Sequence, residues 1–277
     1  MSNLSIGFIG GGKMARAIAA GLLASGYDGA AIRVSEPSAG QRDVLLEDLP
    51  GVRIVDNNSD VALHSSCLVL AVKPQIMAAV CRDLAPPVQE ARPLIISIAA
   101  GIRCTDIDAW LGGGLPIVRV MPNQPALLRQ GVSGIFANEQ VSDAERARAE
   151  TIMAAVGRVV RVARETDIDV VTAISGSGPA YFFLLIDMLA RTAAELGLDE
   201  ESANILAIDT ASGAAALAAA SDVPMETLIA SVRSPGGTTA AALDSLDQQN
   251  IRDIFARALT AARNRAVELA DRAHNQN

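Results

Sequence analysis

The sequence predicts an α/β fold with two parts: an N-terminal doubly wound sheet, followed by an all-helical C-terminal domain. Up to about residue 160, short β-branched apolar runs alternate with amphipathic stretches, which is typical of a parallel sheet with helical crossovers. From about residue 167 the strand signals almost disappear and long alanine-rich stretches replace them. We therefore divide the chain into domains at 1–163 and 164–277.

Six strands are expected in the first domain. Each is short, rich in Val, Ile and Leu, and bounded by Gly, Pro or polar residues. Their near-continuous apolar character fits strands that are covered on both faces. The expected strands lie within 4–10, 31–37, 51–56, 67–74, 93–101 and 116–122.

Three long helices are expected in the second domain, within 169–198, 200–221 and 250–273. Their many small residues allow close helix–helix packing. So many apolar helices in one domain predict a dimerisation interface, and hence a homo-oligomer.

The composition argues against several classes of function. A net charge of −8 without a basic stripe, and only 3% aromatic residues, argue against nucleic acid as a partner. Cys67, Cys81 and Cys104 are an odd number at no metal spacing, so we expect reduced thiols and no metal site. We find no run of about 18 uncharged apolar residues and no basic leader, so we expect no membrane span and a cytoplasmic protein.

A glycine-rich motif follows the first expected strand. Gly10-x-Gly12-x-x-Ala15 stands between that strand and a helix, which is the Rossmann dinucleotide fingerprint. Gly10 permits a tight turn, and Gly12 lets the backbone approach a pyrophosphate at the helix N-terminus. A merely structural strand–helix turn is the alternative.

The identity of the nicotinamide cofactor depends on the end of the second expected strand. Glu36 stands where an acidic residue accepts a hydrogen bond from a ribose 2′-hydroxyl, which favours NAD(H) because a carboxylate repels a 2′-phosphate. Ser35, Ser38 and Arg42 offer a phosphate site instead, and an ordinary solvated charge at Glu36 is equally compatible. The cofactor is therefore NADP(H) or NAD(H).

Two further segments, 71–75 and 97–102, follow expected strands at their carboxyl ends, where open α/β sheets bind ligands. Lys73 is one of only two lysines in the chain, and the alternative for it is a solvated loop charge. A third segment, 121–126, follows the last expected strand.

The helical domain lacks the usual acids for carbonyl reduction. It contains no lysine, its one histidine is His274, and Tyr181 is its only tyrosine. An imine avoids this difficulty, because its nitrogen is basic enough to be protonated before hydride arrives. Tyr181 or a water molecule could still be the proton donor.

Two breaks interrupt the helical pattern. After Ser234-Pro235, the pair Gly236-Gly237 leaves backbone N–H groups uncovered, and Thr238 or Thr239 is expected to cap the helix that follows. Such a helix N-terminus is a small anion cradle, suited to a substrate carboxylate. A plain turn with a Thr cap is the alternative. The stretch 175–181 repeats the pattern, so we expect free N–H groups there too.

The chain resembles the pyrroline-5-carboxylate reductase family over nearly its whole length. The motifs are "GFIGGGKMA", "LAVKPQ", "SIAAGI", "RVMPNQPA", "SGSGPAYFF" and "SPGGTT", in family order and spacing. The resemblance implies NAD(P)H-dependent reduction of L-1-pyrroline-5-carboxylate to L-proline, the last step of proline biosynthesis. It also implies an interlocked homodimer and, in some relatives, a decamer of five dimers.

The resemblance also implies roles for particular residues. Thr239 would hydrogen-bond the ring nitrogen and is the catalytic candidate. The implied substrate-binding residues are Ser175, Gly176, Ser177, Gly178, Ser234, Gly236, Gly237, Thr238 and Thr239. The implied cofactor-binding residues are Ile9, Gly10, Gly11, Gly12, Lys13, Met14, Ser35, Glu36, Asn58, Ala71, Val72, Lys73, Pro74, Ala99, Ala100, Gly101 and Asn123.

Four positions deserve notice against the family pattern. Glu36 puts the usual NADPH preference in doubt, whereas Gln124 and Ala242 are expected to be tolerated. Asp222 replaces a common Glu, and it is either a contact to a partner's site or a loop charge.

Two alternative functions are a related imine or 2-hydroxyacid reductase and a silent NAD(P)-binding regulator. The absent Lys or His argues against hydroxyacid chemistry, and the intact "SPGGTT" argues against the silent binder.

Overall fold

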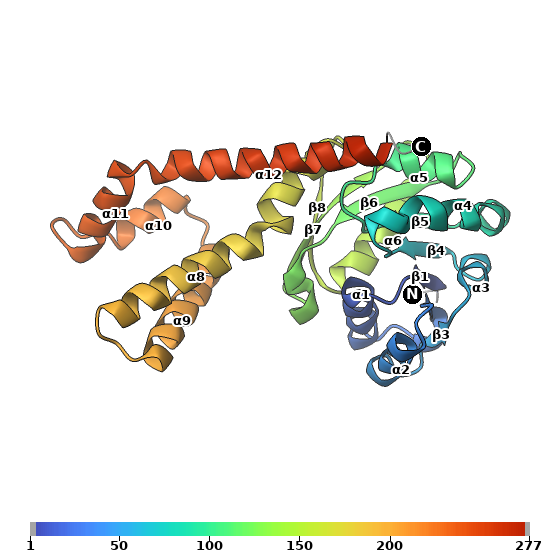
Figure 1. Ribbon diagram of the computed structural model, residues 1–277, viewed down its shortest axis with the longest axis horizontal. Coiled ribbons are helices and arrows are strands. Elements are labelled where there is room, and N and C mark those ends of the chain that lie inside the picture. The colour runs from blue at the N-terminus through green and yellow to red at the C-terminus, as the bar shows by residue number, and fades with distance from the viewer. Residues whose placement is uncertain (1–3, 275–277) are drawn as a thin grey trace. The chain divides into compact units, whose positions relative to one another are not determined.

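The structure is a computed structural model that describes residues 4–274 (Figure 1). The chain forms two compact units. The sheet unit comprises Met1–Ser177 and Ala262–Asn277, and the helical unit comprises Gly178–Ala261. Residues 164–177 thus group with the sheet, whereas the functional domain boundary at 163/164 stays a prediction.

One eight-stranded sheet forms the centre of the sheet unit, in the order β3-β2-β1-β4-β5-β6-β7-β8. The first six strands have the 3-2-1-4-5-6 order of a doubly wound fold, which confirms the predicted fold class. Neighbouring strands are parallel except β6 and β7. The strands are β1 (Ile6–Ile9), β2 (Ile32–Ser35), β3 (Arg53–Val55), β4 (Cys67–Leu70), β5 (Leu94–Ser97), β6 (Ile117–Met121), β7 (Gly131–Ala137) and β8 (Gly157–Arg161).

All six predicted strands are present, but β7 and β8 were not predicted. In β7, Gly131, Ser133 and Gly134 dilute the apolar run that would mark a strand. In β8 Arg158, Val160 and Arg161 are exposed and Gly157 and Val159 are partly buried, as expected for the edge of a sheet. Neither pattern resembles the near-continuous apolar runs of the inner strands.

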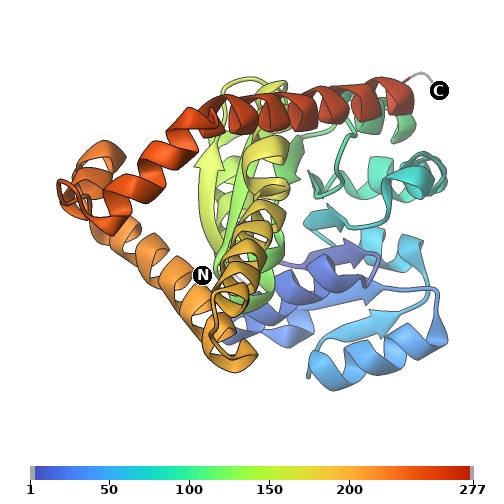
Figure 2. The same ribbon diagram turned by 60° about the vertical axis from the view of Figure 1, so that its left-hand side comes forward.

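Helices cover both faces of the sheet, and each face has its own apolar core (Figure 2). On one face, side chains of α1, α2 and α6 pack with residues such as Phe8 and Val69. On the other, α3, α4 and α5 pack with residues such as Leu68 and Ile95. The helical segments are α1 (Lys13–Ala24), η1 (Gly29–Ala31), α2 (Ala39–Asp48), α3 (Asn58–Leu63), α4 (Pro74–Ala91), α5 (Cys104–Trp110), η2 (Gln124–Leu128), α6 (Asp143–Ala154) and α7 (Asp167–Val171).

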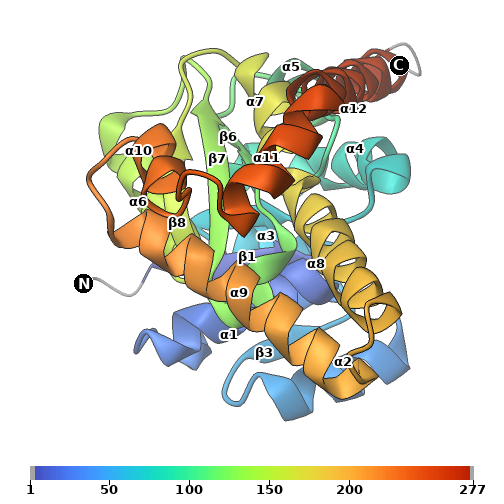
Figure 3. The same cartoon turned by 90° about the vertical axis from the view of Figure 1, so that its left-hand side faces the viewer.

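The helical unit contains no strand among its residues 178–261, all of which the structure describes. α8 and α9 contact each other (Figure 3). α12 begins in this unit and ends in the sheet unit. The helices are α8 (Gly178–Glu195), α9 (Glu200–Ala220), α10 (Met225–Ser231), α11 (Thr238–Gln248) and α12 (Ile251–His274).

α8 begins at Gly178, within the expected break at 175–181, but the residues before it do not form an open turn. α7 leads into a π-helical turn, η3 (Thr172–Gly176), and α8 follows. The Ser177 N–H donates to the Thr172 carbonyl over 2.9 Å, so it is not one of the free amides that we expected. Pro179 has no N–H to donate, and the wider turn accommodates that gap in the helix.

Apolar side chains are unusually exposed in the helical unit; Phe182 is 62% exposed and Leu206 is 55% exposed. Two helical stretches, Asp167–Glu195 and Glu200–Ala220, are also long and apolar enough to cross a membrane by length and composition alone. We had expected no such stretch. That expectation rested on the absence of uncharged runs, whereas the first of these two stretches carries Asp187 and Arg191.

Candidate active site

The glycine-rich loop is shaped by close backbone contacts. Gly10 has φ +97°, and a Cβ there would lie 3.0 Å from the Ala71 carbonyl oxygen, so only glycine fits. Its N–H donates to the Ser35 carbonyl over 2.8 Å, which joins the end of β1 to the end of β2. The loop therefore lies where β1, β2 and β4 end.

The N-terminus of α1 is open to an anion. Gly12 is the N-cap and no side chain caps this helix, so the first N–H groups of α1 have no acceptor within it. A Cβ on Gly12 would meet nothing within 4 Å. An exposed, uncapped helix start beside glycines fits a pyrophosphate, and so the residues present fit a dinucleotide cofactor.

Glu36 lies against this loop. One carboxylate oxygen, Oε2, accepts from the Gly11 N–H over 3.0 Å, and the other, Oε1, accepts from the Ser38 N–H over 3.0 Å. Arg42 donates instead to the backbone carbonyls of Glu36 and Pro37. Glu36 is therefore a partly buried acceptor at the edge of the loop, and not a freely solvated charge.

Other predicted cofactor residues lie at the same edge of the sheet. The Ser35 hydroxyl donates to Asn58 Oδ1 over 2.6 Å. Lys73 is the exposed N-cap of α4, directly before Pro74. Ala99, Ala100 and Gly101 follow β5.

Four other residues that were predicted to bind the cofactor lie in or near the loops after β1 and β6. Ile9 is fully buried in the core. Met14 is half-buried against the core, whereas Lys13 is exposed at the start of α1. Asn123 is the N-cap of η2, and its Oδ1 accepts from the Val132 N–H over 2.9 Å, which holds the loop after β6 to β7.

The Ser234–Thr239 segment forms a tight turn and a helix start. Pro235 precedes Gly236, which has φ +70°, and the Gly237 N–H donates to the Ser234 carbonyl over 3.0 Å. Pro followed by glycine at positive φ is the pattern of a type II turn. α11 then begins at Thr238.

The expected threonine cap is wrong. Gly237 is the N-cap of α11, in an extended conformation, and no side-chain oxygen caps the helix. Thr238 and Thr239 are instead the first two helical residues. Their N–H groups have no acceptor within the helix, and the Thr239 hydroxyl is not used as a cap. The helix start is thus more open to an anion than the sequence predicted.

The predicted residues Ser175–Gly178 lie on the π-helical turn and at the start of α8. The Ser175 hydroxyl donates to the Val171 carbonyl over 3.0 Å. A Cβ on Gly176 would lie 2.5 Å from Met121 Cε, so a larger residue there would require the end of the Met121 side chain to move. Widened helical turns of this kind often occur at functional sites.

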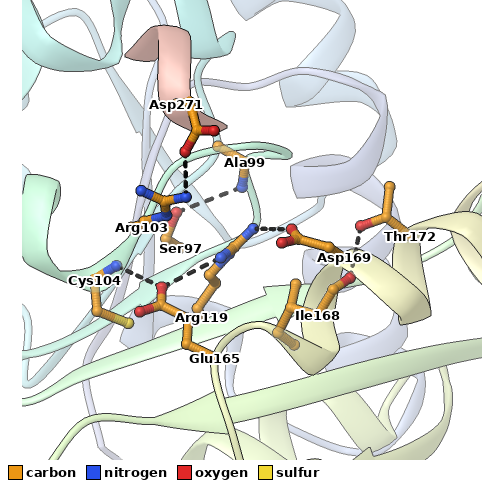
Figure 4. Close-up of polar contacts among 10 residues, drawn as sticks. All are labelled: Ser97, Ala99, Arg103, Cys104, Arg119, Glu165, Ile168, Asp169, Thr172 and Asp271. Atoms are coloured by element: carbon orange, nitrogen blue, oxygen red, sulfur yellow. Dashed lines mark hydrogen bonds and ion pairs between the residues drawn. The ribbon is translucent and has the colours of Figure 1, made fainter. Parts of the chain in front are cut away.

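A buried ionic cluster was not predicted from the sequence (Figure 4). Arg119, on β6, is 1% exposed and contacts Glu165 Oε1 and Asp169 Oδ1, each at 3.3 Å. Glu165 Oε1 also accepts from the Cys104 N–H over 2.7 Å. An arginine inside an apolar strand was the available signal, but nothing in the sequence indicated its partners.

The cysteines are buried and free. Burial raises the pKa of Cys67 to about 11 and that of Cys81 to about 12. Burial also raises the pKa of Cys104, and Glu165 adds to that shift. Among residues 4–274 we find no cluster of three His, Cys, Asp or Glu side chains that could hold a metal.

Two family models match the chain, one over the region of the glycine-rich loop and the other over the helical segments of the site. Residues 165–269 match the family "Pyrroline-5-carboxylate reductase dimerisation". Residues 5–101 match "NADP oxidoreductase coenzyme F420-dependent". The exposed apolar helices α8 and α9 thus lie in a region that matches a dimerisation family, which indicates a homo-oligomer.

Relatives match over almost the full length. A pyrroline-5-carboxylate reductase of Pseudomonas aeruginosa is 45% identical, covering 98% of both chains. The structure of such a reductase from Coxiella burnetii has a TM-score of 0.93 at 43% identity, covering 97% of this chain and 99% of that one.

The Plasmodium falciparum pyrroline carboxylate reductase was solved with NADP bound. It has a TM-score of 0.85 at 29% identity, covering 98% of this chain and 99% of its own. The identities, the coverage and the matched dimerisation region lead to one conclusion. This chain belongs to the pyrroline-5-carboxylate reductase family, whose members are NAD(P)-dependent oxidoreductases.

Proposed function

We propose that this chain reduces the C=N bond of L-1-pyrroline-5-carboxylate to give L-proline, as the last step of proline biosynthesis in the cytoplasm. The observation that carries the proposal is the uncapped start of α11 behind the Ser234–Gly237 turn. An open helix N-terminus attracts a carboxylate, and this cyclic imine carries one. The small-molecule substrate thus fits the chemistry of the segment.

In this proposal the chain's own residues bind and orient. The N–H groups at the start of α11 bind the substrate carboxylate. The segment Ser175–Gly178 is proposed to bind substrate as well. The Thr239 hydroxyl donates to the ring nitrogen as that nitrogen gains electron density. The bound nicotinamide supplies the hydride. Orientation of this kind lowers a barrier by several kcal/mol, up to roughly 7–11 in well-aligned cases.

Glu36 governs the choice of cofactor in our proposal. Its carboxylate is fixed beside the loop by the Gly11 and Ser38 amides, so it offers an acceptor to a ribose hydroxyl and repels a 2′-phosphate. We therefore expect efficient use of NADH as well as NADPH. Glu36→Gln keeps an oxygen for Gly11 but removes the charge, so it should raise NADPH efficiency relative to NADH. An unchanged ratio would contradict this role.

The assembly is proposed to be a dimer, with five dimers forming a decamer. The exposed apolar faces of α8 and α9 are the support for the dimer. Sedimentation velocity on the purified chain would distinguish the two states by mass.

The decisive test is steady-state oxidation of NADPH and, separately, NADH with pyrroline-5-carboxylate. We expect turnover of roughly 1–10³ s⁻¹. The matched control is 1-pyrroline, which has the same C=N bond but no carboxylate and should react with a much lower kcat/KM. Equal efficiency with both imines would contradict the carboxylate cradle. Absence of turnover in folded protein that binds either cofactor would contradict the proposed reaction.

A further inference from the structure

We propose that Arg119, Glu165 and Asp169 form a positioning cluster that fixes the cofactor loop 99–104 and the substrate segment 175–177 relative to each other. The proposal rests on the proposed function, because that function assigns these two segments to cofactor and substrate. All three residues and both segments lie in the sheet unit. None of the three needs to touch either ligand for this role.

Glu165 anchors the loop 99–104, which is proposed to bind the cofactor. Its Oε1 accepts from the N–H of Cys104, the first residue of α5, which follows Ala99–Gly101 by only a few residues (Figure 4). Residues of α12 also lie close to this loop. Arg103 pairs with Asp271 at 2.6 Å, and a Cβ on Gly101 would lie 3.3 Å from Leu269 Cβ. Glu165 is the one of these anchors that Arg119 also contacts.

Asp169 anchors the helical segment that leads into residues 175–177, which are proposed to bind the substrate. It lies on α7, one residue after Ile168, whose carbonyl accepts from the Thr172 hydroxyl over 2.8 Å. Thr172 starts the π-helical turn, and its carbonyl in turn accepts from the Ser177 N–H over 2.9 Å. In the proposal, a shift of Asp169 moves the neighbouring Ile168 and, through its carbonyl, the start of the turn that carries Ser175.

Arg119 joins Glu165 and Asp169 by its geometry. Nη1 contacts Glu165 and Nη2 contacts Asp169, so one planar guanidinium holds two carboxylates. A lysine offers a single point charge and cannot reproduce this arrangement. Without the cation, two carboxylates four residues apart would repel each other in a largely buried place. Met121, on the same strand, places its side chain beside Gly176 of the turn.

A pair of alanine variants separates positioning from mere stability. Glu165→Ala and Asp169→Ala each remove one partner of Arg119, so both should lower the melting temperature. Only Glu165→Ala frees the Cys104 amide. We expect it to weaken NADPH binding, measured by titration without substrate, by about tenfold, which corresponds to about 1.4 kcal/mol. Its KM for pyrroline-5-carboxylate should change little.

Asp169→Ala should show the opposite pattern, with KM for pyrroline-5-carboxylate raised by about tenfold and NADPH affinity nearly unchanged. Glu165→Gln and Asp169→Asn retain an oxygen acceptor and should each restore much of the lost parameter. The control is Glu150→Ala, which removes an exposed ion pair with Arg161 on β8 and should leave every parameter unchanged. Arg119→Lys should disturb both parameters.

Three outcomes would overturn the proposal. The first is an equal change in both parameters for the two alanine variants. The second is a change only in melting temperature and active fraction. The third is the absence of rescue by Gln and Asn. If the wild-type chain binds NADPH but does not reduce pyrroline-5-carboxylate, the proposed function fails. The cofactor titration of Glu165→Ala, Glu165→Gln and Glu150→Ala then decides the Glu165 part alone.

Discussion

The two units of the chain bury their apolar side chains differently. In the sheet unit, β1, β4 and β5 are buried at every position, and helices line both faces. Within 178–261, all of which the structure describes, the buried hydrophobic residues are three alanines, Ala190, Ala203 and Ala207. Larger side chains of the helical unit remain exposed; they include Phe182, Phe183, Leu184, Met188, Leu189, Ile205, Leu206, Ile208 and Leu217.

This difference indicates two sources of stability. The sheet unit buries its apolar surface within one chain, so its core is complete without a partner. The helical unit exposes far more apolar surface than a stable single chain normally tolerates, and it matches a dimerisation family. We infer that a second copy supplies the missing burial. The following predictions test this contrast, from the largest expected effect to the smallest.

The largest effect should come from a charge placed on the exposed apolar surface of α8. Met188 is 54% exposed and lines an apolar cavity of about 250 Å³ with Leu184, Ile254 and Phe255. Met188→Asp would bury an unpaired carboxylate if a partner covers this surface, which costs several kcal/mol. We expect sedimentation velocity to show monomer in place of oligomer, together with loss of activity.

The matched control for Met188→Asp is Leu46→Asp on α2. Leu46 is 56% exposed, so the two substitutions start from similar exposure but lie in different units. Leu46→Asp should leave the oligomer intact. If Met188→Asp also leaves it intact, the proposed source of stability for the helical unit is wrong at this surface.

The next effect should come from a cavity in the sheet core. Leu68 on β4 is fully buried, so Leu68→Ala should lower the free energy of unfolding by about 2–5 kcal/mol. The midpoint of chemical denaturation measures this loss. The difference in midpoint between Leu68→Ala and the wild type should be the same at every protein concentration, because the cavity lies within one chain. A loss that grows on dilution would indicate that the sheet core also depends on assembly.

The contrast between the units also explains what the sequence could predict. Inner strands such as β4 were predicted because both faces are buried, which makes the run continuously apolar. β7 and β8 were not predicted because glycines in β7 and exposed arginines in β8 interrupt the apolar pattern of a strand. The lengths of α9 and α12 were predicted well, since the residue pattern of a long helix is the same whether its own chain or a partner covers its apolar residues.

The candidate site was predictable where backbone chemistry marks it, and not where distant side chains meet. Gly10 and Gly236 need positive φ, so glycine at these positions was informative. The capping role of Thr238 or Thr239 was predicted wrongly, because Gly237 takes the N-cap position instead. Neither the Glu36 contact to Gly11 nor the partners of Arg119 follow from local sequence, because these contacts depend on the order of strands.

A smaller effect is expected at Thr239. Thr239→Val keeps the shape of the side chain but removes the hydroxyl, which in our proposal donates to the ring nitrogen. The loss of this bond should lower kcat/KM, by a factor that corresponds to about 1–3 kcal/mol of transition-state stabilisation. Thr239→Ser keeps a hydroxyl and should retain most of the activity. The hydroxyl is not used as a helix cap, so the oligomer and the melting temperature should change little.

Kinetics of Thr239→Val equal to those of the wild type would contradict the role of the hydroxyl. A loss in Thr239→Ser that exceeds the loss in Thr239→Val would point instead to the methyl group of the threonine, which valine keeps and serine lacks.

The smallest effect concerns the rate at which the three cysteine thiols react with a labelling reagent, which we expect to stay unchanged when the oligomer dissociates. The three cysteines are buried in the sheet unit, and burial raises their thiol pKa values, to about 11 at Cys67 and about 12 at Cys81. At pH 8 they should therefore react with an aromatic disulfide reagent only when the sheet unit opens. If that unit is complete within one chain, Met188→Asp should dissociate the oligomer and yet leave the labelling rates near those of the wild type. Leu68→Ala, which keeps the oligomer, should accelerate labelling instead. Faster labelling in Met188→Asp would mean that assembly also stabilises the sheet, and the contrast between the two units would then be one of degree.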